Sequence, residues 1–275
     1  MKDLDFAGIA RLVEHKHGVP LARFVKEAVP LADGWLLFDA PGSPINKVCG
    51  IGFDQTLMDA DLDRIVTFFT ERGAEPKVEL SPFAPPELLA GLAQRGFVLH
   101  EFENTLVRDL QQGEDLRALL PGGWPTEVTI ERVDPTNIAA VREYVDVAFS
   151  GFFPEGMALP EPIVEFGMRA STAPGYDLFV ARIGREVVGG GGCESSEGVT
   201  QLFGTSVKST HRRRGIQQAL IIRRLERGRE LGSRLAVIHS RPGIPTERNA
   251  ARLGFQMAYA RAVLVKHGEG LVPSP

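Results

Sequence analysis

Apolar and polar positions in the C-terminal half of the chain follow a regular succession of strand and helix patterns. The run over 199–207 predicts a strand, and the run over 216–231 predicts a helix. This helix has a stripe of apolar residues on one side and ends at Gly232; the stripe comprises Ile216, Leu220, Ile221 and Leu225. The pattern continues with a strand over 234–239, a short helix over 246–252 and a last strand over 257–266.

The N-terminal half repeats this order of elements. Residues 92–97, Leu-Ala-Gln-Arg-Gly-Phe, resemble residues 250–255, Ala-Ala-Arg-Leu-Gly-Phe, and a strand pattern precedes and follows each segment. Two units of similar order imply two similar domains. We place them at 1–110 and 126–268, joined by a Gly- and Pro-rich linker over 111–125.

The turn between the strand at 199–207 and the next helix carries three arginines and a glycine. Arg212, Arg213, Arg214 and Gly215 stand directly before the helix. Glycine lets a backbone approach a ligand closely, and a helix N-terminus offers unpaired N–H groups with a positive dipole end. The turn therefore predicts a phosphate or pyrophosphate site. Its spacing fits neither the nucleoside-triphosphate loop nor the dinucleotide fingerprint.

The turn resembles the pyrophosphate arm of the GNAT superfamily of acyltransferases. That pattern is Gln/Arg-x-x-Gly-x-Gly/Ala after a strand ending in a β-branched residue, and Arg212-x-x-Gly215-x-Gln217 follows Val207 here. Gln217 departs from the pattern, because it replaces a small residue. The resemblance covers about residues 126–266. It implies an α/β fold of two tandem GNAT-like domains, each a mostly antiparallel sheet flanked by helices.

The N-terminal domain lacks this turn. Its strand over 48–53 runs into residues 54–62, which contain acids but neither arginine nor a Gly-rich turn. Acidic side chains at this point would repel a pyrophosphate. We therefore interpret this half as a degenerate GNAT-like domain, in a tandem architecture known among GNAT proteins.

The resemblance implies that the C-terminal domain binds acetyl-CoA. The pantetheine arm would pair with a strand edge, and the N–H of Val207 would stabilise the oxyanion that develops at the thioester. Adjacent residues of a turn diverge, so we expect Arg212 and Arg214, more than Arg213, near the phosphates. The residues expected to contact the cofactor are Thr205, Val207, Arg212, Arg213, Arg214, Gly215, Ile216, Gln217 and Asn249.

An amine acceptor must lose a proton before it attacks. Some GNAT relatives place a glutamate six residues before the strand end, but Gln201 stands there and cannot titrate. We expect Glu194, on the neighbouring strand, to act as the base, with His239 as the alternative. A surface glutamate and a buried histidine are the ordinary fates of such residues.

Many relatives carry a tyrosine four residues before the Gly-Phe pair, as the acid for the leaving thiolate. Ala250 stands at that position. Either Ser240 or Tyr259 donates the proton, or the thiolate leaves unassisted, since a thiol is acidic enough.

The acceptor pocket of this fold forms over the first two helices of the domain. The corresponding stretch, 149–157, holds three aromatics that either line an apolar acceptor site or belong to the core: Phe149, Phe152 and Phe153. We expect a small-molecule amine as the acceptor. The alternative is a GNAT-like module that holds coenzyme A without turnover.

Composition further limits the class of protein and the cellular environment that the sequence indicates. The chain has 275 residues and a net charge of −4, with no signal-peptide pattern and no apolar run long enough to span a membrane. Cys49 and Cys193 are isolated, so we expect no metal and a reduced, cytoplasmic environment. Residues 208–234 hold nine Lys/Arg against two Asp/Glu. Arginines 223, 224 and 227 interleave with Glu226 and Glu230 at helical spacing, which favours a solvated helix face over a nucleic-acid surface.

Overall fold

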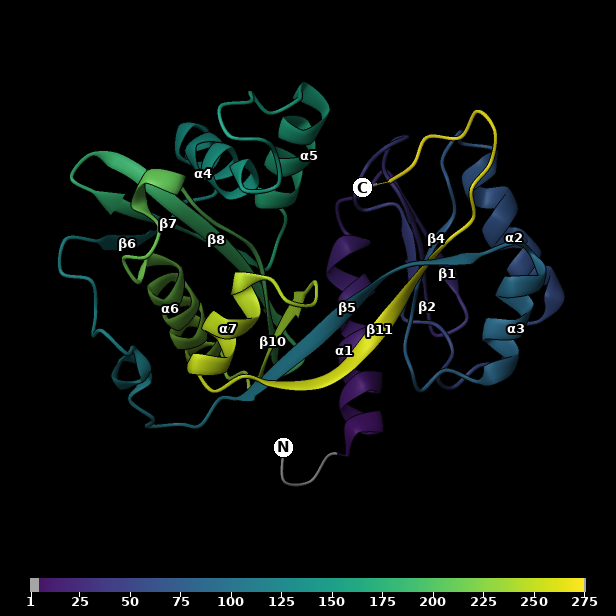
Figure 1. Ribbon diagram of the computed structural model, residues 1–275, viewed down its shortest axis with the longest axis horizontal. Coiled ribbons are helices and arrows are strands. Elements are labelled where there is room, and N and C mark those ends of the chain that lie inside the picture. Colours follow the sequence, from purple (N-terminus) through teal and green to yellow (C-terminus); the bar gives the residue numbers. More distant parts are fainter. Residues whose placement is uncertain (1–4, 275) are drawn as a thin grey trace. The chain divides into compact units, whose positions relative to one another are not determined.

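The computed structural model of the protein describes residues 5–274 and consists of two compact units (Figure 1). The described residues of unit 1 are 5–105 and 257–274, and unit 2 comprises residues 106–256. The helices and strands predicted from the C-terminal pattern are all present, with ends shifted by one residue in most cases.

Unit 1 is a mixed sheet with three helices. Strands β1, β2 and β3 are antiparallel to one another, β3 is parallel to β4, and β4 is antiparallel to β11. The elements are α1 (Phe6–Leu21), β1 (Glu27–Leu31), β2 (Gly34–Phe38), β3 (Lys47–Cys49), α2 (Asp59–Thr70), β4 (Lys77–Leu80), α3 (Pro86–Gln94) and β5 (Val98–Asp109), whose last residues belong to unit 2.

Unit 2 also has both antiparallel and parallel strand pairing. Strands β6 to β9 are antiparallel in sequence order, and β10 is parallel to β9. The elements are two short 3-10 helices, η1 (Leu116–Leu119) and η2 (Ser209–His211), with β6 (Thr129–Arg132), α4 (Ile138–Ser150), α5 (Glu161–Ser171), β7 (Tyr176–Ile183), β8 (Glu186–Ser196), β9 (Val199–Val207), α6 (Ile216–Glu230), β10 (Leu235–Ser240), α7 (Pro245–Arg252) and the start of β11 (Gln256–Val265). Both units match the α/β fold class expected from the sequence.

Helices cover both faces of the sheet in unit 2 (Figure 1). Successive residues of a strand point to opposite faces, and β7 shows this clearly. Phe179 and Ala181 pack in the cluster formed with α6, whereas Leu178 and Val180 pack in the cluster formed with α4. The central strands are therefore buried on both sides.

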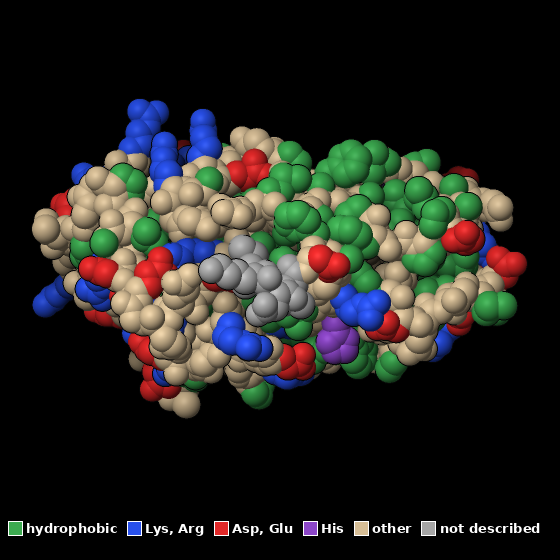
Figure 2. Space-filling model, turned by 90° about the horizontal axis from the view of Figure 1, so that it is seen from below, with side chains coloured by type: hydrophobic (Ala, Val, Ile, Leu, Met, Phe, Trp, Pro, Cys, Tyr) green, Lys and Arg blue, Asp and Glu red, His purple; other side chains and the backbone are tan. Residues whose placement is uncertain are grey.

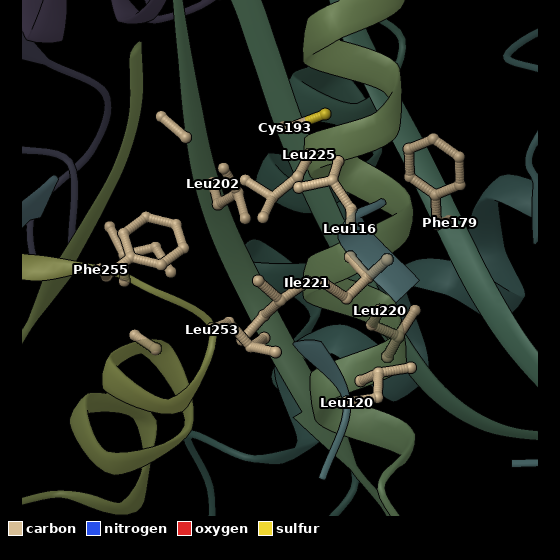
Figure 3. Packing of buried hydrophobic residues seen from close by; sticks show 14 of the residues in the cluster. Leu116, Leu120, Phe179, Cys193, Leu202, Leu220, Ile221, Leu225, Leu253 and Phe255 are labelled. Atoms are coloured by element: carbon tan, nitrogen blue, oxygen red, sulfur yellow. The ribbon is translucent and has the colours of Figure 1, made fainter. Parts of the chain in front are cut away.

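The stretch expected to be a linker, 111–125, is part of the folded unit 2. Leu116 and Leu120 are buried and pack with Leu220 and Leu225 of α6 (Figure 3). The Gly and Pro residues that suggested a linker surround this apolar patch. Residues 111–125 thus contribute to the hydrophobic core that packs against α6.

The C-terminal strand also differs from expectation. From Met257 onward β11 belongs to unit 1, although the sequence boundary had placed it in the second domain to residue 268. Ala262 pairs with Leu80 and Val265 with Lys77 of β4, and Leu264 is buried in the core of unit 1. A strand lies where its edge hydrogen bonds and apolar face are satisfied, and β4 provides both.

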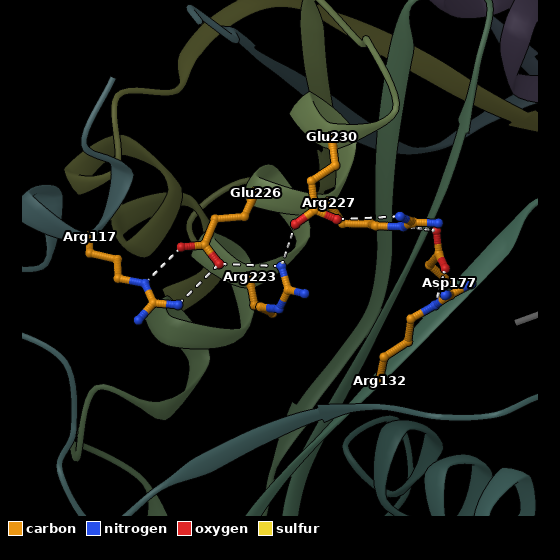
Figure 4. A network of polar contacts seen from close by, with 7 residues as sticks. All are labelled: Arg117, Arg132, Asp177, Arg223, Glu226, Arg227 and Glu230. Carbon is orange, nitrogen blue, oxygen red and sulfur yellow. Dashed lines mark hydrogen bonds and ion pairs between the residues drawn. The ribbon is translucent and has the colours of Figure 1, made fainter. Parts of the chain in front are cut away.

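Two of the four arginines of α6, Arg223 and Arg227, are paired with acids (Figure 4). Glu226 accepts hydrogen bonds from Arg117, at 2.8 Å, and from Arg223, at 3.4 Å. Arg227 donates to Asp177 at 2.8 Å and to Glu230 at 3.3 Å. These contacts confirm the solvated, charge-paired face, except that Arg224 is fully buried instead of lying on that face.

A buried ionic cluster fixes β11 in unit 1. The guanidinium of Arg261 lies 3.0 Å from Glu79 and 3.3 Å from Glu14, and Lys47 lies 2.6 Å from the other oxygen of Glu79. Burial alone would raise the pKa of Glu79, but the charges of Arg261, Lys47 and His17 hold that pKa well below its usual range.

On the surface of unit 1, apolar side chains gather in the view of Figure 2. Exposed apolar residues of this unit include Phe83, Val98 and Phe102. Within residues 5–274, every helix is too short or too polar to cross a membrane.

We expect Glu79→Gln to lower the free energy of unfolding of unit 1 by about 3–5 kcal/mol, because it removes the buried carboxylate that pairs with both Lys47 and Arg261. The depressed pKa of Glu79 stabilises the fold above the ordinary carboxyl pKa of 4.5, and this contribution is lost as the pH falls through the lower folded value. Urea unfolding at pH 7 and pH 4 measures both effects.

The matched control is Glu269→Gln, on an exposed residue, which should change stability by less than about 0.5 kcal/mol. Equal stabilities of the two variants at pH 7 would contradict a stabilising role for the cluster.

Candidate functional site

The candidate site begins where two parallel strands of unit 2 separate. Pairing between β9 and β10 ends at Leu202 and Ile238, although β9 continues to Val207. Beyond this point a cavity of about 860 Å³ opens. Three elements line it: the end of β9, the turn into α6 with its first residues, and α7. The lining residues include Thr205, Ser206, Val207, His211, Arg212, Arg213, Gly215, Ile216, Gln217, Gln218, Thr246, Arg248, Asn249 and Arg252.

The turn into α6 has an unusual backbone. Arg213 and Gly215 both have positive φ, +64° and +75°. Gly215 is the N-cap of α6 and provides no side chain to cap the helix. The N–H groups of the first turn are therefore available beside the cavity, with the positive end of the helix dipole behind them.

The three arginines of the turn take different directions. Arg212 and Arg213 line the cavity, and Arg212 donates from Nε to the carbonyl of Val207 at 3.3 Å. Arg214 pairs instead with Glu127 at 3.2 Å. Of the two arginines expected near the phosphates, Arg212 lines the cavity and Arg214 does not, whereas Arg213 does. The left-handed conformation at Arg213 redirects the chain and could not be seen in the sequence.

Gln217, the residue that departs from the family pattern, binds across to α7. Its Oε1 accepts from Asn249 Nδ2 at 2.6 Å, and its Nε2 donates to the hydroxyl of Thr246 at 3.4 Å. Gln218 donates to the Oδ1 of Asn249 at 3.3 Å. These amides hold α7 beside the start of α6 and fix the width of the cavity.

Sequence reasoning missed two arginines of α7. Arg248 and Arg252 both line the cavity. They stand four residues apart on a helix, and that spacing places side chains on one face. This i, i+4 spacing in the sequence could have indicated that both arginines face the same site.

The residues expected to catalyse lie outside the set of cavity-lining residues, apart from Val207. Glu194 is buried on β8, opposite Gln201 of β9, one register position from the last β9–β10 pair. The hydroxyl of Ser240 donates to the carbonyl of Arg241 at 3.3 Å. Tyr259 belongs to unit 1, where its hydroxyl donates to Glu14 at 2.7 Å.

The stretch 149–157 reaches the cavity through a glycine. Gly151 lines the cavity, and a Cβ on it would lie 2.6 Å from the hydroxyl of Ser206. Phe149 is partly buried against Phe166, Phe153 is half-buried, and Phe152 is 69 % exposed. Phe149 therefore contributes to the core, and Phe152 is the aromatic that a ligand could contact.

Both cysteines are buried in the structure. Burial raises the pKa of Cys193 to about 12 and raises the pKa of Cys49 as well. Neither is a reactive thiolate at neutral pH. Across residues 5–274, no three His, Cys, Asp or Glu side chains are grouped so that they could hold a metal ion.

Comparisons with solved structures show the same fold. A GCN5-related N-acetyltransferase from Kribbella flavida matches 94% of this chain and 96% of its own, at 19% identity and a TM-score of 0.70. A tandem GNAT protein from the clavulanic acid biosynthesis pathway matches 84% of this chain and 78% of its own, at 16% identity and a TM-score of 0.59. A search among curated proteins found no match.

The family model described as the acetyltransferase (GNAT) family matches residues 138–255. This range contains α4, the divergent strands, the arginine turn and α7, and so includes every element that lines the cavity. Residues 138–255 of this chain therefore match a GNAT acetyltransferase domain.

Proposed function

We propose that the protein is an acetyl-CoA-dependent N-acetyltransferase that acts on a primary amine of a small molecule by direct attack in a ternary complex. One observation carries this proposal. The edge of β9 beyond Leu202 is not paired with β10, and it leads directly to an uncapped helix N-terminus flanked by Arg212 and Arg213. An extended ligand with an anionic end fits this combination.

Coenzyme A has the chemistry that these residues recognise. Arg212, Arg213 and the N–H groups from Gly215 to Gln217 would hold its phosphates, while Arg214 stays with Glu127. The strand edge from Thr205 to Val207 would pair with the amide groups of the pantetheine arm. Ile216 and Asn249 lie on the facing walls of the cavity.

The domain's own residues can then support acyl transfer, with the thioester supplying the acetyl group. The N–H of Val207 would stabilise the developing oxyanion. Glu194 would accept the amine proton through water. Ser240 would donate to the leaving thiolate, or the thiolate would leave unassisted, because Ala250 occupies the position of the usual tyrosine and is fully buried.

Unit 1 contains a comparable turn that is occupied by the protein itself. After β3 the N–H groups of Phe53, Asp54 and Gln55 all donate to one oxygen of Asp33, at 3.0, 2.8 and 3.1 Å. These donors would otherwise suit an anion. We infer that unit 1 binds no coenzyme A and acts as a structural or acceptor-shaping domain, and that each chain binds one.

The acceptor that best fits the site is a small amine. The arginines on the outer face of α6 are engaged by Glu226, Glu230 and Asp177 (Figure 4), which leaves little charge for a nucleic acid. Phe152 and Gly151 lie at the α4–α5 turn, where an acceptor could approach. We expect the protein to act in the cytoplasm.

The competing function is a module that binds coenzyme A without turnover. Gln201 and Ala250 favour it, since they stand where many relatives have the base and the acid. Release of free thiol with a panel of amines separates the two functions.

Gly215→Asp should weaken coenzyme A binding by at least about tenfold relative to Gly215→Asn. Both side chains tolerate positive φ, and a Cβ here meets nothing within 4 Å, so the two variants should fold alike. Only the carboxylate repels the phosphates. Calorimetry measures affinity and stoichiometry, and the wild type should bind close to one coenzyme A per chain.

Two equivalent sites in the wild type would refute the assignment to unit 2 alone. Equal affinities of the Asp and Asn variants for coenzyme A would contradict the placement of its phosphates at this turn.

Arg213→Asn should weaken binding of inorganic pyrophosphate about tenfold, consistent with about 1.5–3 kcal/mol for a hydrogen bond to a charged group. Asparagine tolerates the left-handed conformation, so the turn should keep its shape. Arg214→Asn is the matched control and should bind pyrophosphate like the wild type. If Arg214→Asn instead bound pyrophosphate more weakly than Arg213→Asn, the sequence-based prediction that Arg214 contacts the phosphates would be correct.

Glu194→Gln should lower the rate of thiol release at neutral pH by about 10²–10⁴-fold, the usual contribution of a general base. The defect should shrink as rising pH deprotonates the amine without help, while coenzyme A affinity stays unchanged. A pH–rate profile of both proteins with any accepted amine tests this, and superimposable profiles would exclude Glu194.

A further inference from the structure

Arg224 of α6 is a fully buried arginine without an acidic partner. Its Nε donates to the carbonyl of Leu220 at 2.9 Å, and one terminal nitrogen donates to the carbonyls of Gly192, at 3.0 Å, and Phe203, at 3.2 Å. The other terminal nitrogen has no hydrogen-bond partner among the described residues. Burial lowers the pKa of Arg224 to about 10, so it remains charged at neutral pH. A buried charge without a counter-ion is costly.

The sheet is built around this side chain. A Cβ on Gly191 would lie 3.0 Å from the guanidinium carbon of Arg224. On the other face, a Cβ on Gly190 would meet Val147, and one on Gly192 would lie 2.8 Å from the hydroxyl of Tyr144. The glycine run of β8 is therefore the space that Arg224 and α4 occupy, which the sequence pattern alone did not explain.

Arg224 also stabilises an irregularity of the sheet. The register of β8 with β9 shifts between Gly190 and Gly192, and Gly204 opposite has a φ of +56°. Such a bulge leaves carbonyls without their ladder partners. The guanidinium binds one carbonyl from each strand at this point and so holds the bulge in place.

The bulge lies where β9 and β10 separate. Phe203, whose carbonyl Arg224 binds, is the first residue after the last β9–β10 pair at Leu202. From Val207, beside the arginine turn, back to Phe203 is about 13 Å at the rise of a β-strand. An extended arm whose anionic end binds the turn, and whose amides pair along Thr205 to Val207, would thus bring its thioester toward Phe203 and Arg224. This placement differs from the contact with the N–H of Val207 that we expected from the sequence.

We propose that Arg224 is a positioning residue that fixes the bulge beside the cofactor strand and places a positive charge behind the reacting thioester. This inference rests on the proposed function. When the amine nitrogen attacks, the C–N bond forms, the C–S bond breaks, and its electron pair remains on sulfur as a thiolate. The amine proton goes to the base through water. The charge of Arg224 stabilises the thiolate without transferring a proton, and so compensates for Ala250 in place of the usual tyrosine.

Three other titratable side chains lie near this point. Tyr144 of α4 and Cys193 of β8 interact electrostatically with Arg224, and burial raises the pKa of both, that of Cys193 to about 12. They are neutral at pH 7–9. His239 follows Ile238 at the end of the β10 pairing, and His239→Gln is therefore included as a control.

The experiment measures the ionisation of the thiol of bound coenzyme A by the ultraviolet absorbance of the thiolate. In the wild type the bound thiol should titrate about one pH unit below the free thiol, as a nearby cation favours the charged form. Arg224→Met should bring the midpoint back to that of free coenzyme A or above it. Arg224→Lys should keep most of the shift, because it retains the charge, while it weakens coenzyme A binding through the altered bulge.

A purely structural role predicts that no folded variant changes the midpoint. Gly191→Ala retains Arg224 but displaces it, and should reduce the shift. The double variant Gly191→Ala, Arg224→Met should have a melting temperature no lower than that of Arg224→Met, because the new Cβ no longer meets a guanidinium. The thiol of coenzyme A bound to this double variant should titrate as it does in Arg224→Met. Identical midpoints for the wild type and folded Arg224→Met would overturn the inference. A wild type that binds no coenzyme A would overturn the proposed function instead.

Discussion

Parallel strands normally satisfy each other's N–H and C=O groups, and in unit 2 this pairing stops early between β9 and β10. The last pair is Leu202 and Ile238, and the backbone of β9 beyond it faces a cavity. Polar backbone groups at such an edge require water or a ligand. The turn into α6 adds directed N–H groups and two arginines at the open end. The same constraint therefore selects both the extended shape of the ligand and its charged terminus.

The separation of β9 from β10 begins next to an irregularity in the pairing of β9 with β8. A bulge between β8 and β9 interrupts the ladder, and Arg224 binds the carbonyls of Gly192 and Phe203 there. A side chain on Gly191 would displace the guanidinium. The glycines, the bulge and the arginine depend on one another, and a change to one of them should be felt at the strand edge that lines the cavity.

Local patterns were enough to predict β9, α6, β10, α7, β11 and the arginine turn, because periodicity and turn residues are local properties. We grouped Arg224 with Arg223 and Arg227 on a solvated helix face, although it stands two and six residues from Glu226 and Glu230 and four from Leu220 of the apolar stripe. Local patterns could not choose between Arg213 and Arg214, because the left-handed conformation at Arg213 decides that choice. The membership of β11 in unit 1 depends on pairing with β4, which is far away in the sequence.

The two units resolve the same problem of unpaired N–H groups in opposite ways. In unit 1 the turn after β3 donates three N–H groups to Asp33, which lies in the short turn between β1 and β2. A carboxylate that accepts several backbone hydrogen bonds stabilises a turn without any ligand. In unit 2 the turn into α6 has no side-chain cap. A unit that satisfies its own donors gains stability and loses the capacity to bind an anion, whereas a unit that leaves them available keeps a binding site. The proposed division of roles between the two units thus rests on one carboxylate, Asp33, which unit 1 has at its turn and which has no counterpart at the turn into α6.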